Sequence, residues 1–284
     1  MKQKRVVAIH DISCVGRCSL TVALPVLSAA GLETSVLPTA VLSTHTGDFT
    51  GYTYRDLSED IPAIAAHWKT LGLHTDAFYT GYLASEEQVD TVRALIRDLR
   101  DADSLVMVDP VMGDNGRLYD KFSPSFPDRM RRLCEDADLL IPNRTEAYLL
   151  LGEDPQKACR EEPETEVLLH RLAALGPSRV ILTGVSPDPS HLGAVLYDSR
   201  TGETVSAFSN RADGFYYGTG DLLASALLGA ILRGRSDADA LRLSVRFTSE
   251  SIRRTAEEGR DRRYGVNFEQ GLGDYIAGLN EKQS

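Results

Sequence analysis

The sequence predicts one α/β domain over residues 1–284, in which a mainly parallel sheet carries helices on both faces. Short β-rich segments alternate with longer segments of helical periodicity, an order that favours parallel strands joined by helices. Several β-rich segments are continuous apolar runs, which are typical of strands buried on both faces. The clearest is residues 105–109, where Leu-Val-Met-Val precedes Asp109. We see no linker or repeat that would divide the chain.

Eight segments have the composition of strands. They are residues 5–10, 34–42, 77–80, 105–109, 139–142, 180–183, 193–197 and 204–209. Residues 198–202, Asp-Ser-Arg-Thr-Gly, separate the last two and have the composition of a turn. The sequence therefore predicts an antiparallel hairpin at this end of the sheet.

Four segments have the signals of helices. Ser85 with Gln88 forms a capping-box pattern that opens a helix to about Arg100. The others show an apolar stripe at helical spacing or a Ser-Asp-Ala-Asp start, and we expect helices at residues 164–175, 222–231 and 236–255. The longest irregular stretches are expected at residues 113–127 and 154–163.

Composition narrows the class of function. The net charge is −10, from 31 basic and 41 acidic side chains, which disfavours binding to nucleic acid or to an anionic membrane surface. An anionic ligand would need a local site made of backbone amides and a metal. No apolar run has the length of a membrane span or a signal peptide, and the four cysteines have no disulfide-framework or zinc-site spacing. We therefore expect a cytoplasmic protein.

The sharpest motif is Gly218-Thr219-Gly220-Asp221, directly before the helix expected at 222–231. Two glycines let the backbone turn tightly and bring its amides close to a ligand. The amides at the helix start and the positive end of its dipole suit a phosphate. Asp221 could then take a proton from a neighbouring hydroxyl. The alternative is that Asp221 only caps the helix amides.

A second motif is Asp109-Pro110-Val111-Met112-Gly113-Asp114. Asp109 ends a buried strand, and the turn brings Asp114 back toward the same edge of the sheet. Two carboxylates there suit Mg²⁺, which keeps several waters and takes its other ligands from phosphate oxygens. The alternative is an Asp-Pro turn with a solvated Asp114.

A third motif is Asn143-Arg144-Thr145-Glu146, after the strand at 139–142. It has the pattern of a capping box, and such a helix start can also face a nucleotide. Thr183-Gly184 fits either a strand-end turn or a backbone approach to phosphate. The chain lacks Gly-x-x-x-x-Gly-Lys, Gly-x-Gly-x-x-Gly, Gly-x-Ser-x-Gly and His-Glu-x-x-His, which disfavours the enzyme classes that use them.

Six motifs in this order resemble the ribokinase-like superfamily, and within it the pyridoxal kinase family (pyridoxal, pyridoxine and pyridoxamine kinases). They are Ile9-His10-Asp11 with Val15-Gly16, Ser43-Thr44-His45-Thr46-Gly47, Gly81-Tyr82-Leu83, residues 109–114, Pro142-Asn143 with Glu146, and residues 218–221. The resemblance covers nearly the whole chain and implies a three-layer α/β/α sandwich. It also implies phosphorylation of the 5′-hydroxymethyl group of a B6 vitamer by ATP with Mg²⁺, often with K⁺, by a homodimer.

The resemblance also implies roles for individual residues. Asp221 would be the catalytic base, and Gly218, Thr219 and Gly220 would line the anion hole. Asp109, Asp114 and Glu146 would surround the metal and phosphates, and Asn143, Thr183 and Gly184 would approach the nucleotide together with Asp109 and Glu146. Thr46 and Tyr82 would hold the substrate ring, with Gly16 allowing close approach and residues 211–217 lining both sites.

One position departs from the family pattern. Pyridoxal kinases commonly carry a serine at the end of the first strand, where this chain has Asp11. Asp11 could form a turn that only closes the strand. Our hypothesis is that its carboxylate pairs with a cationic substrate, through a protonated ring nitrogen or the amine of pyridoxamine.

Two other functions stay open from the sequence. A hydroxymethylpyrimidine kinase has a similar fold and substrate, although such enzymes usually carry cysteine at the position of Asp221. A protein that binds a B6 vitamer without catalysis is the second alternative, because fold does not determine function.

Overall fold

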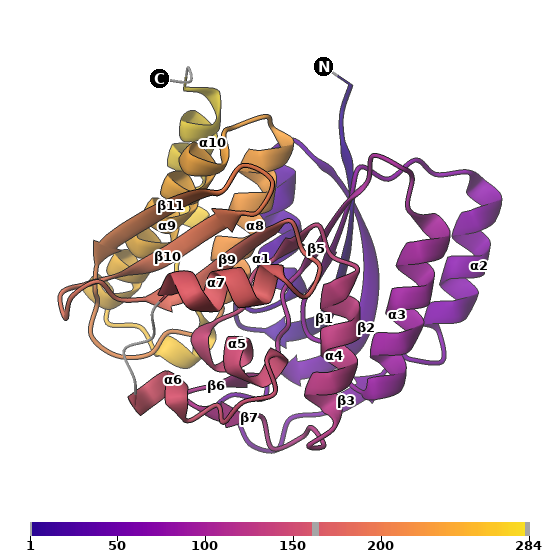
Figure 1. Ribbon diagram of the computed structural model, residues 1–284, viewed down its shortest axis with the longest axis horizontal. Coiled ribbons are helices and arrows are strands. Elements are labelled where there is room, and N and C mark those ends of the chain that lie inside the picture. The colour runs from indigo at the N-terminus through magenta and orange to yellow at the C-terminus, as the bar shows by residue number, and fades with distance from the viewer. Residues whose placement is uncertain (1, 161–164, 282–284) are drawn as a thin grey trace.

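The computed structural model describes residues 2–160 and 165–281, and its main feature is a nine-stranded sheet (Figure 1). The strand order is β11-β10-β9-β8-β5-β4-β1-β2-β3. The central six, from β9 to β2, run parallel, while β10 and β3 pair antiparallel with β9 and β2 at the two sides. The strands are β1 Arg5–Val15, β2 Glu33–Thr44, β3 Tyr54–Asp56, β4 Ala77–Thr80, β5 Leu105–Val108, β8 Leu139–Leu140, β9 Arg179–Val185, β10 His191–Asp198 and β11 Glu203–Asn210.

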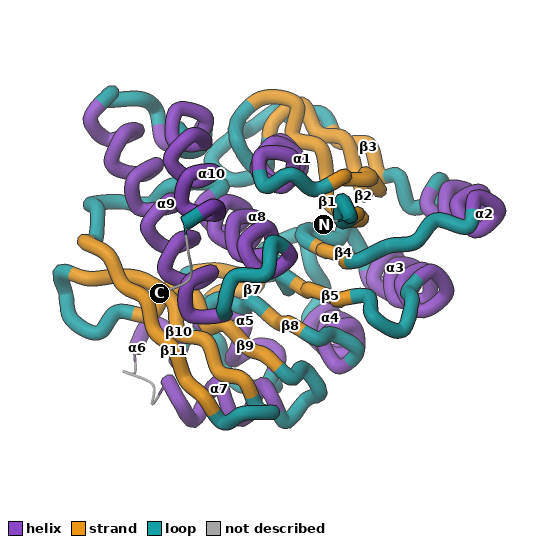
Figure 2. The backbone as a smooth tube through the Cα atoms, turned by 90° about the horizontal axis from the view of Figure 1, so that it is seen from above, coloured by secondary structure: helices purple, strands orange, loops and turns teal. Residues whose placement is uncertain are grey.

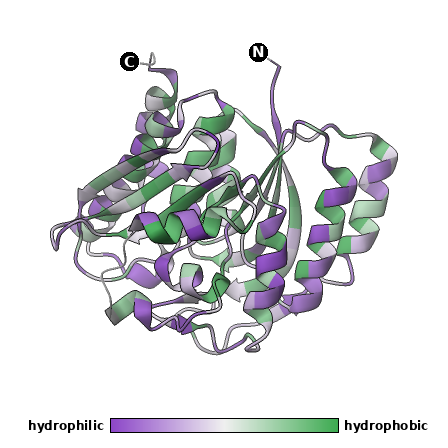
Figure 3. Cartoon of the chain, in the orientation of Figure 1, coloured by the Kyte–Doolittle hydropathy of each residue, from purple (hydrophilic) through white to green (hydrophobic). Residues whose placement is uncertain are grey.

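Helices cover both faces of this sheet, as the view in Figure 2 shows. One layer holds α1 Leu20–Ala29, α8 Thr219–Leu232, α9 Asp237–Glu257 and α10 Leu272–Asn280, and the other holds α2 Ile61–Leu71, α3 Glu86–Leu99, α4 Phe126–Glu135, α5 Arg144–Leu150 and α7 Thr165–Ala173. Each layer encloses its own buried apolar cluster against the sheet. The strands between the layers are largely hydrophobic and the outer helix faces mostly hydrophilic (Figure 3). This confirms the predicted α/β/α architecture.

All eight predicted strands are present, and the hairpin is confirmed as β10 and β11. The first strand was predicted too short, because it continues from residue 10 to Val15. It does so through a bulge between His10 and Ile12, where the register against β2 shifts. Asp11 lies at this bulge. The strand therefore does not close at Asp11, and the strand-closing turn considered for this residue is wrong.

The four predicted helices correspond to α3, α7, α8 and α9. Ser85 caps α3 by accepting a hydrogen bond from the amide of Gln88, but the Gln88 side chain accepts from the amide of Ala84, so the capping box is only half formed. Residue 164, the expected start of α7, lies outside the described residues. The helix α1 was missed, because its internal Pro25 argues against a helix.

The two stretches expected to be irregular carry more structure than predicted. Residues 113–127 contain a small hairpin, β6 Gly113–Asp114 with β7 Arg117–Leu118, and the start of α4. Elements of two residues are too short to leave a periodic signal. Residues 154–160 include α6 Lys157–Arg160, and residues 161–163 lie outside the described part of the chain.

Candidate active site

The order of the strands lines up the predicted site residues along the carboxyl edge of the sheet. Asp11 lies in β1, Thr46 follows β2, and Tyr82 follows β4, which are three neighbouring strands. We call this carboxyl edge of the sheet the rim. It continues at the ends of β5, β8 and β9, where the residues expected around the metal and the nucleotide lie: Asp109, Asn143, Thr183 and Gly184. Ligands of open α/β sheets bind at this edge. The predicted substrate half and nucleotide half are therefore adjacent.

The start of α8 is built against the loop that follows β1. Gly218 is the N-cap of α8 and has a left-handed backbone, with φ of 73°. A Cβ at Gly218 would lie 2.0 Å from the carbonyl oxygen of Arg17, so no larger residue fits without moving that loop. Gly220 is exposed, and no atom lies within 4 Å of its Cβ position. The amides of Thr219 and Gly220 have no hydrogen-bond partner among the described residues, so this helix start keeps the donors that an anion needs.

Asp221 is held by the loop and not by its own helix. Its Oδ2 accepts hydrogen bonds from the amide of Ser19, at 2.8 Å, and from the thiol of Cys18, at 3.5 Å. Among the described residues, these are its hydrogen-bond donors, so the capping role considered for Asp221 is not observed. Burial raises the pKa of Asp221 to about 6, although the hydrogen bonds from Ser19 and Cys18 lower it. Asp221 as a residue is only partly buried, and a proton acceptor must be reachable by the bound alcohol.

Three acidic residues gather next to this helix start. Burial raises the pKa of Asp109 well above its usual range, and the charges of Glu146 and Asp221 add to this. Burial also raises the pKa of Glu146 to about 8, with Asp114 adding to the rise. Burial raises the pKa of Asp114 as well, so the fully solvated Asp114 considered above is not observed. Burial and mutual repulsion disfavour the ionised form of these carboxylates, and a bound cation would stabilise that form.

The cluster fits a metal that takes few ligands from the protein. Glu146 uses its carboxylate in a capping box with Asn143 and also accepts from the amide of Met112, at 3.2 Å. The Asp109 carboxylate accepts no hydrogen bond from any described residue. Within residues 2–160 and 165–281, no three acidic, histidine or cysteine side chains could enclose an ion by themselves. Mg²⁺ bound through waters and substrate phosphates does not need such an enclosure.

The nucleotide half of the rim is fastened by backbone and amide contacts. The side chain of Asn143 donates to the carbonyl of Gly113, at 2.9 Å, and so ties α5 to the β6–β7 hairpin. Thr183 pairs with Asn143 across a parallel bridge, and its amide donates to the carbonyl of Pro142, at 3.0 Å. Gly184 is exposed in a left-handed conformation with open space at its Cβ position. The predicted nucleotide residues therefore come together at one corner.

The substrate half is lined by aromatic side chains. Asp11 is buried and accepts from the hydroxyl of Ser13, at 3.1 Å. Tyr82 is half-buried, with its ring centroid 5.7 Å from that of Phe122. Thr46 is exposed in the loop after β2. Gly16 lies close to His45 and to the backbone of Tyr264, so a side chain there would narrow this part of the rim.

Sequence reasoning missed several residues of this half. His45 is buried, with Nε2 2.6 Å from the carbonyl oxygen of Arg263, and its ring lies 4.7 Å from the ring of Tyr217. Its place beside Thr46 in a recognised motif could have signalled it. Cys18, Tyr54 and Lys121 had no such signal, because their neighbours come from distant parts of the chain.

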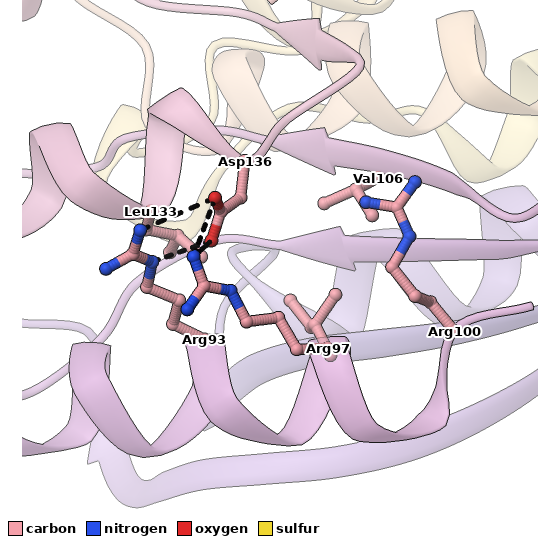
Figure 4. Close-up of a pocket in the computed structure, with 7 residues that line it drawn as sticks. Arg93, Arg97, Arg100, Val106, Leu133 and Asp136 are labelled. Carbon is pink, nitrogen blue, oxygen red and sulfur yellow. Dashed lines mark hydrogen bonds and ion pairs between the residues drawn. The ribbon is translucent and has the colours of Figure 1, made fainter. Parts of the chain in front are cut away.

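The structure has two cavities of note, and only one of them borders the site residues. One, of about 490 Å³, borders Gly16 and is formed by the loop after β1 and the turn around Tyr264. The other, of about 110 Å³, lies between α3 and α4, near the amino ends of β5 and β8 (Figure 4). There Arg93 and Arg97 both pair with Asp136, at 2.6 and 2.9 Å. This second cavity is at the opposite edge of the sheet from Asp221.

The sequence profile of the phosphomethylpyrimidine kinase family matches residues 27–265. The chain belongs to this family. The match excludes Asp11 and Gly16 but includes residues 218–221. The kinase is 28% identical to the pyridoxal kinase of Arabidopsis thaliana, over 89% of this chain and 83% of that one.

This kinase is also similar to solved structures of kinases over nearly its whole length. A Bacteroides thetaiotaomicron protein, provisionally assigned as a phosphomethylpyrimidine kinase and crystallised with pyridoxal, is 36% identical, with a TM-score of 0.90 over 100% of this chain and 98% of that one. The pyridoxal kinase of Lactobacillus plantarum is 33% identical, with a TM-score of 0.89 over 98% of both chains. None of the kinase's described helices is long and apolar enough to cross a bilayer.

Proposed function

We propose that this kinase transfers the γ-phosphoryl group of ATP to the 5′-hydroxymethyl group of a B6 vitamer, as in vitamin B6 salvage. The observation that carries the proposal is the start of α8. The first-turn amides of Thr219 and Gly220 have no hydrogen-bond partner among the described residues, and the same turn carries Asp221, whose carboxylate accepts a hydrogen bond from the amide of Ser19 at 2.8 Å. An anion site beside a proton acceptor is what phosphoryl transfer to an alcohol needs.

Each group of residues along the rim has its own role in the proposed reaction. Gly218, Thr219 and Gly220 present amides to the transferred phosphoryl group, and Asp221 takes the proton of the attacking hydroxyl. Asp109, Asp114 and Glu146 would hold Mg²⁺, directly or through water. Bound Mg²⁺ supplies positive charge that offsets the charge of the phosphates. Asn143, Thr183 and Gly184 position the nucleotide.

The substrate half supports a flat heterocycle with charged groups. Tyr82 offers an aromatic face, and Thr46, Asp11 and Gly16 stand on the neighbouring strand ends. The relatives named pyridoxal kinase and the related structure with pyridoxal support a B6 vitamer as the substrate. They do not favour hydroxymethylpyrimidine, and the complete set of acidic residues does not favour a carrier without catalysis.

The proposal also covers the domain organisation, the oligomeric state, the compartment and the ions used. We propose one kinase domain over residues 1–284, a homodimer in the cytoplasm, and the use of K⁺ beside Mg²⁺, which the family resemblance implies for many members. Each of these is a separate prediction. Sedimentation, and turnover with K⁺ replaced by Na⁺, would test the dimer and the ion requirement.

The test of the function is turnover with a panel of substrates. The kinase is incubated with Mg²⁺·ATP and pyridoxal, pyridoxine, pyridoxamine or hydroxymethylpyrimidine, and ADP release and product mass are measured. We expect vitamer-dependent ADP release and a singly phosphorylated vitamer. A higher kcat/KM for hydroxymethylpyrimidine would assign the chain to thiamine synthesis, and vitamer binding without ADP release would make it a carrier.

A further inference from the structure

One cationic side chain faces the substrate half of the rim without an ion-pair partner. Lys121 follows β7, and its Nζ lies 3.2 Å from the ring centroid of Tyr54 and 5.7 Å from that of Tyr82. Its ammonium forms neither a hydrogen bond nor an ion pair with any residue that the structure describes. The hydroxyl groups of Tyr54 and Tyr82 are buried and form no well-aligned hydrogen bond with a described residue, although they lie close enough to interact with each other. The ammonium of Lys121 therefore keeps its hydrogen-bonding capacity free beside two tyrosine hydroxyl groups.

The neighbouring residue holds Lys121 in place. Phe122 is buried, and its ring stacks on that of Phe126, at 3.8 Å between centroids, where α4 begins. The same ring contacts Tyr82. This stack of aromatic rings beside Lys121 restricts the path of the backbone at the base of its side chain. Lys121 is therefore attached to a well-packed segment of the chain.

Two carboxylates act on the ammonium of Lys121. Burial lowers the pKa of Lys121, while the carboxylates of Asp56 and Asp11 raise it. Asp56 lies in β3 beside Tyr54, and Asp11 lies at the bulge of β1. Asp11 also acts on Asp221, whose pKa it raises. Asp11 is therefore close enough to act on both the lysine and the proposed base, and the surroundings of Tyr54 contain one ammonium and two carboxylates, of which Asp11 lies nearer the base.

This arrangement matches a zwitterionic ring. A 3-hydroxypyridine such as a B6 vitamer carries a protonated ring nitrogen and an ionised phenolic oxygen, on different sides of one flat ring. We propose that Lys121 is a specificity-determining residue that binds the phenolic oxygen of the substrate, while Asp11 pairs with its ring nitrogen. The assignment rests on the function proposed above and names the chemical feature that this pocket selects.

The energetics favour transfer of the ammonium from the tyrosine face to the substrate. A cation over an exposed aromatic ring gains little, whereas a hydrogen bond between two ionised groups is among the strongest in proteins. The tyrosine ring and the phenolic oxygen attract the same charge, so the ammonium is already in the pocket when the substrate enters. A ring without the phenolic oxygen gains nothing from Lys121.

The experiment compares two substrates in four proteins. Pyridoxine and 3-deoxypyridoxine, which lacks the phenolic oxygen, are assayed with the wild type, Lys121→Met, Lys121→Arg and Lys69→Met. Lys69 is an exposed residue of α2 and serves as the matched control. We expect Lys121→Met to lower kcat/KM for pyridoxine about tenfold or more, mainly through KM. It should leave kcat/KM for 3-deoxypyridoxine unchanged, while Lys121→Arg retains most of the preference.

The outcomes separate the inference from the function on which it rests. If the wild type phosphorylates pyridoxine and Lys121→Met loses activity equally with both substrates, or loses none, the inference is wrong and the proposed function stands. If the wild type phosphorylates neither compound and no other vitamer, the proposed function fails, and the role of Lys121 fails with it. Unchanged ADP affinity and thermal unfolding of Lys121→Met, measured alongside, exclude a folding defect.

Discussion

The backbone amide of Ser19 donates a hydrogen bond of 2.8 Å to the carboxylate of Asp221, although 202 positions separate them in the sequence. Ser19 is the N-cap of α1 and adopts a positive φ of 55°, which is uncommon outside glycine. Asp221 lies in the first turn of α8. The starts of two helices are thus fastened to each other, and the expected base is oriented by the loop that also borders the substrate half of the rim.

Replacing Asp221 by asparagine tests its role as the base. Asp221→Asn should keep the hydrogen bond from Ser19 but lose the proton acceptor, so kcat should fall by about 10²–10⁴-fold. ADP and vitamer binding should change little. Calorimetry and steady-state kinetics measure both effects, with Asp274→Asn on the exposed side of α10 as the control. Near-normal turnover in Asp221→Asn would remove it from the chemistry.

The pKa of Asp221 predicts the acid limb of the pH profile. Because the base must be deprotonated and its pKa is raised to about 6, kcat/KM should rise with pH and level off above that value. The thiol of Cys18 lowers this pKa by its hydrogen bond. Cys18→Ala should therefore move the limb to higher pH. Profiles of both proteins, with Cys14→Ala as the control for an exposed thiol, check the shift, and an unmoved limb would contradict it.

Alanine variants of two glycines with the same backbone conformation distinguish the effect of backbone strain from the effect of a changed site geometry. Gly218 and Gly202 both have φ near 73° (73° and 74°), but only Gly218 has an atom within 4 Å of its Cβ position. Both alanine variants should lose about 1–2 kcal/mol of stability from the left-handed backbone. Gly218→Ala must also displace Arg17, and we expect kcat to fall on the order of 10²-fold. Equal activity of the two variants would show that the loop contact is dispensable.

The acidic cluster should make stability depend on pH. Between the ordinary carboxyl pKa and the value of about 8 for Glu146, the folded state binds more protons than the unfolded state, so stability falls as pH rises. Without ligands, Tm should be higher at pH 5.5 than at pH 8. Glu146→Gln should flatten this dependence, because it removes the group that titrates near 8, while it also loses one of the two amide hydrogen bonds that Glu146 accepts.

Thermal unfolding over this pH range tests the cluster directly. Mg²⁺ with ADP should flatten the wild-type profile in the same way, because a bound cation relieves the repulsion. Glu59→Gln, on an exposed turn before α2, is the control. A wild-type Tm that rises toward pH 8 without ligands would contradict the prediction.

Replacing Asp11 distinguishes the two groups of the substrate with which its carboxylate could pair, the amine and the ring nitrogen. If its carboxylate pairs with the amine of the substrate, the wild type should prefer pyridoxamine over pyridoxal, and Asp11→Ser should lose this preference. If it pairs with the ring nitrogen, both vitamers should lose kcat/KM in parallel. A charge-assisted hydrogen bond of about 1.5–3 kcal/mol corresponds to roughly 10- to 100-fold in either case. Kinetics with both vitamers decide, and an unaffected Asp11→Ser would exclude both roles.

Much of the site followed from residues that are neighbours in the sequence. The capping box of Asn143 and Glu146 depends on a spacing of one helical turn, and the structure confirms it. The left-handed turn at Gly218 likewise follows from glycine before a helix start. The parallel sheet was readable from its apolar runs, because strands buried on both faces must be apolar throughout.

Other features had no local signal. The helix α1 contains a proline, and β6 and β7 are too short to show a period. The bulge that keeps β1 extended past Asp11 depends on its pairing with β2, which one strand cannot reveal. Lys121 lies in a stretch expected to be irregular, and its neighbours come from distant parts of the chain, Tyr54 from β3 and Tyr82 from the loop after β4.

The sequence by itself determined the fold class, the order of the motifs and the residue types available for phosphoryl transfer, because helix starts, turns and buried strands are specified by residues close together in the chain. Only the tertiary structure decided which amide orients Asp221, how far burial raises the pKa of Glu146, and where the ammonium of Lys121 lies. Those properties arise from desolvation and contacts between distant segments, which exist only once the sheet has assembled.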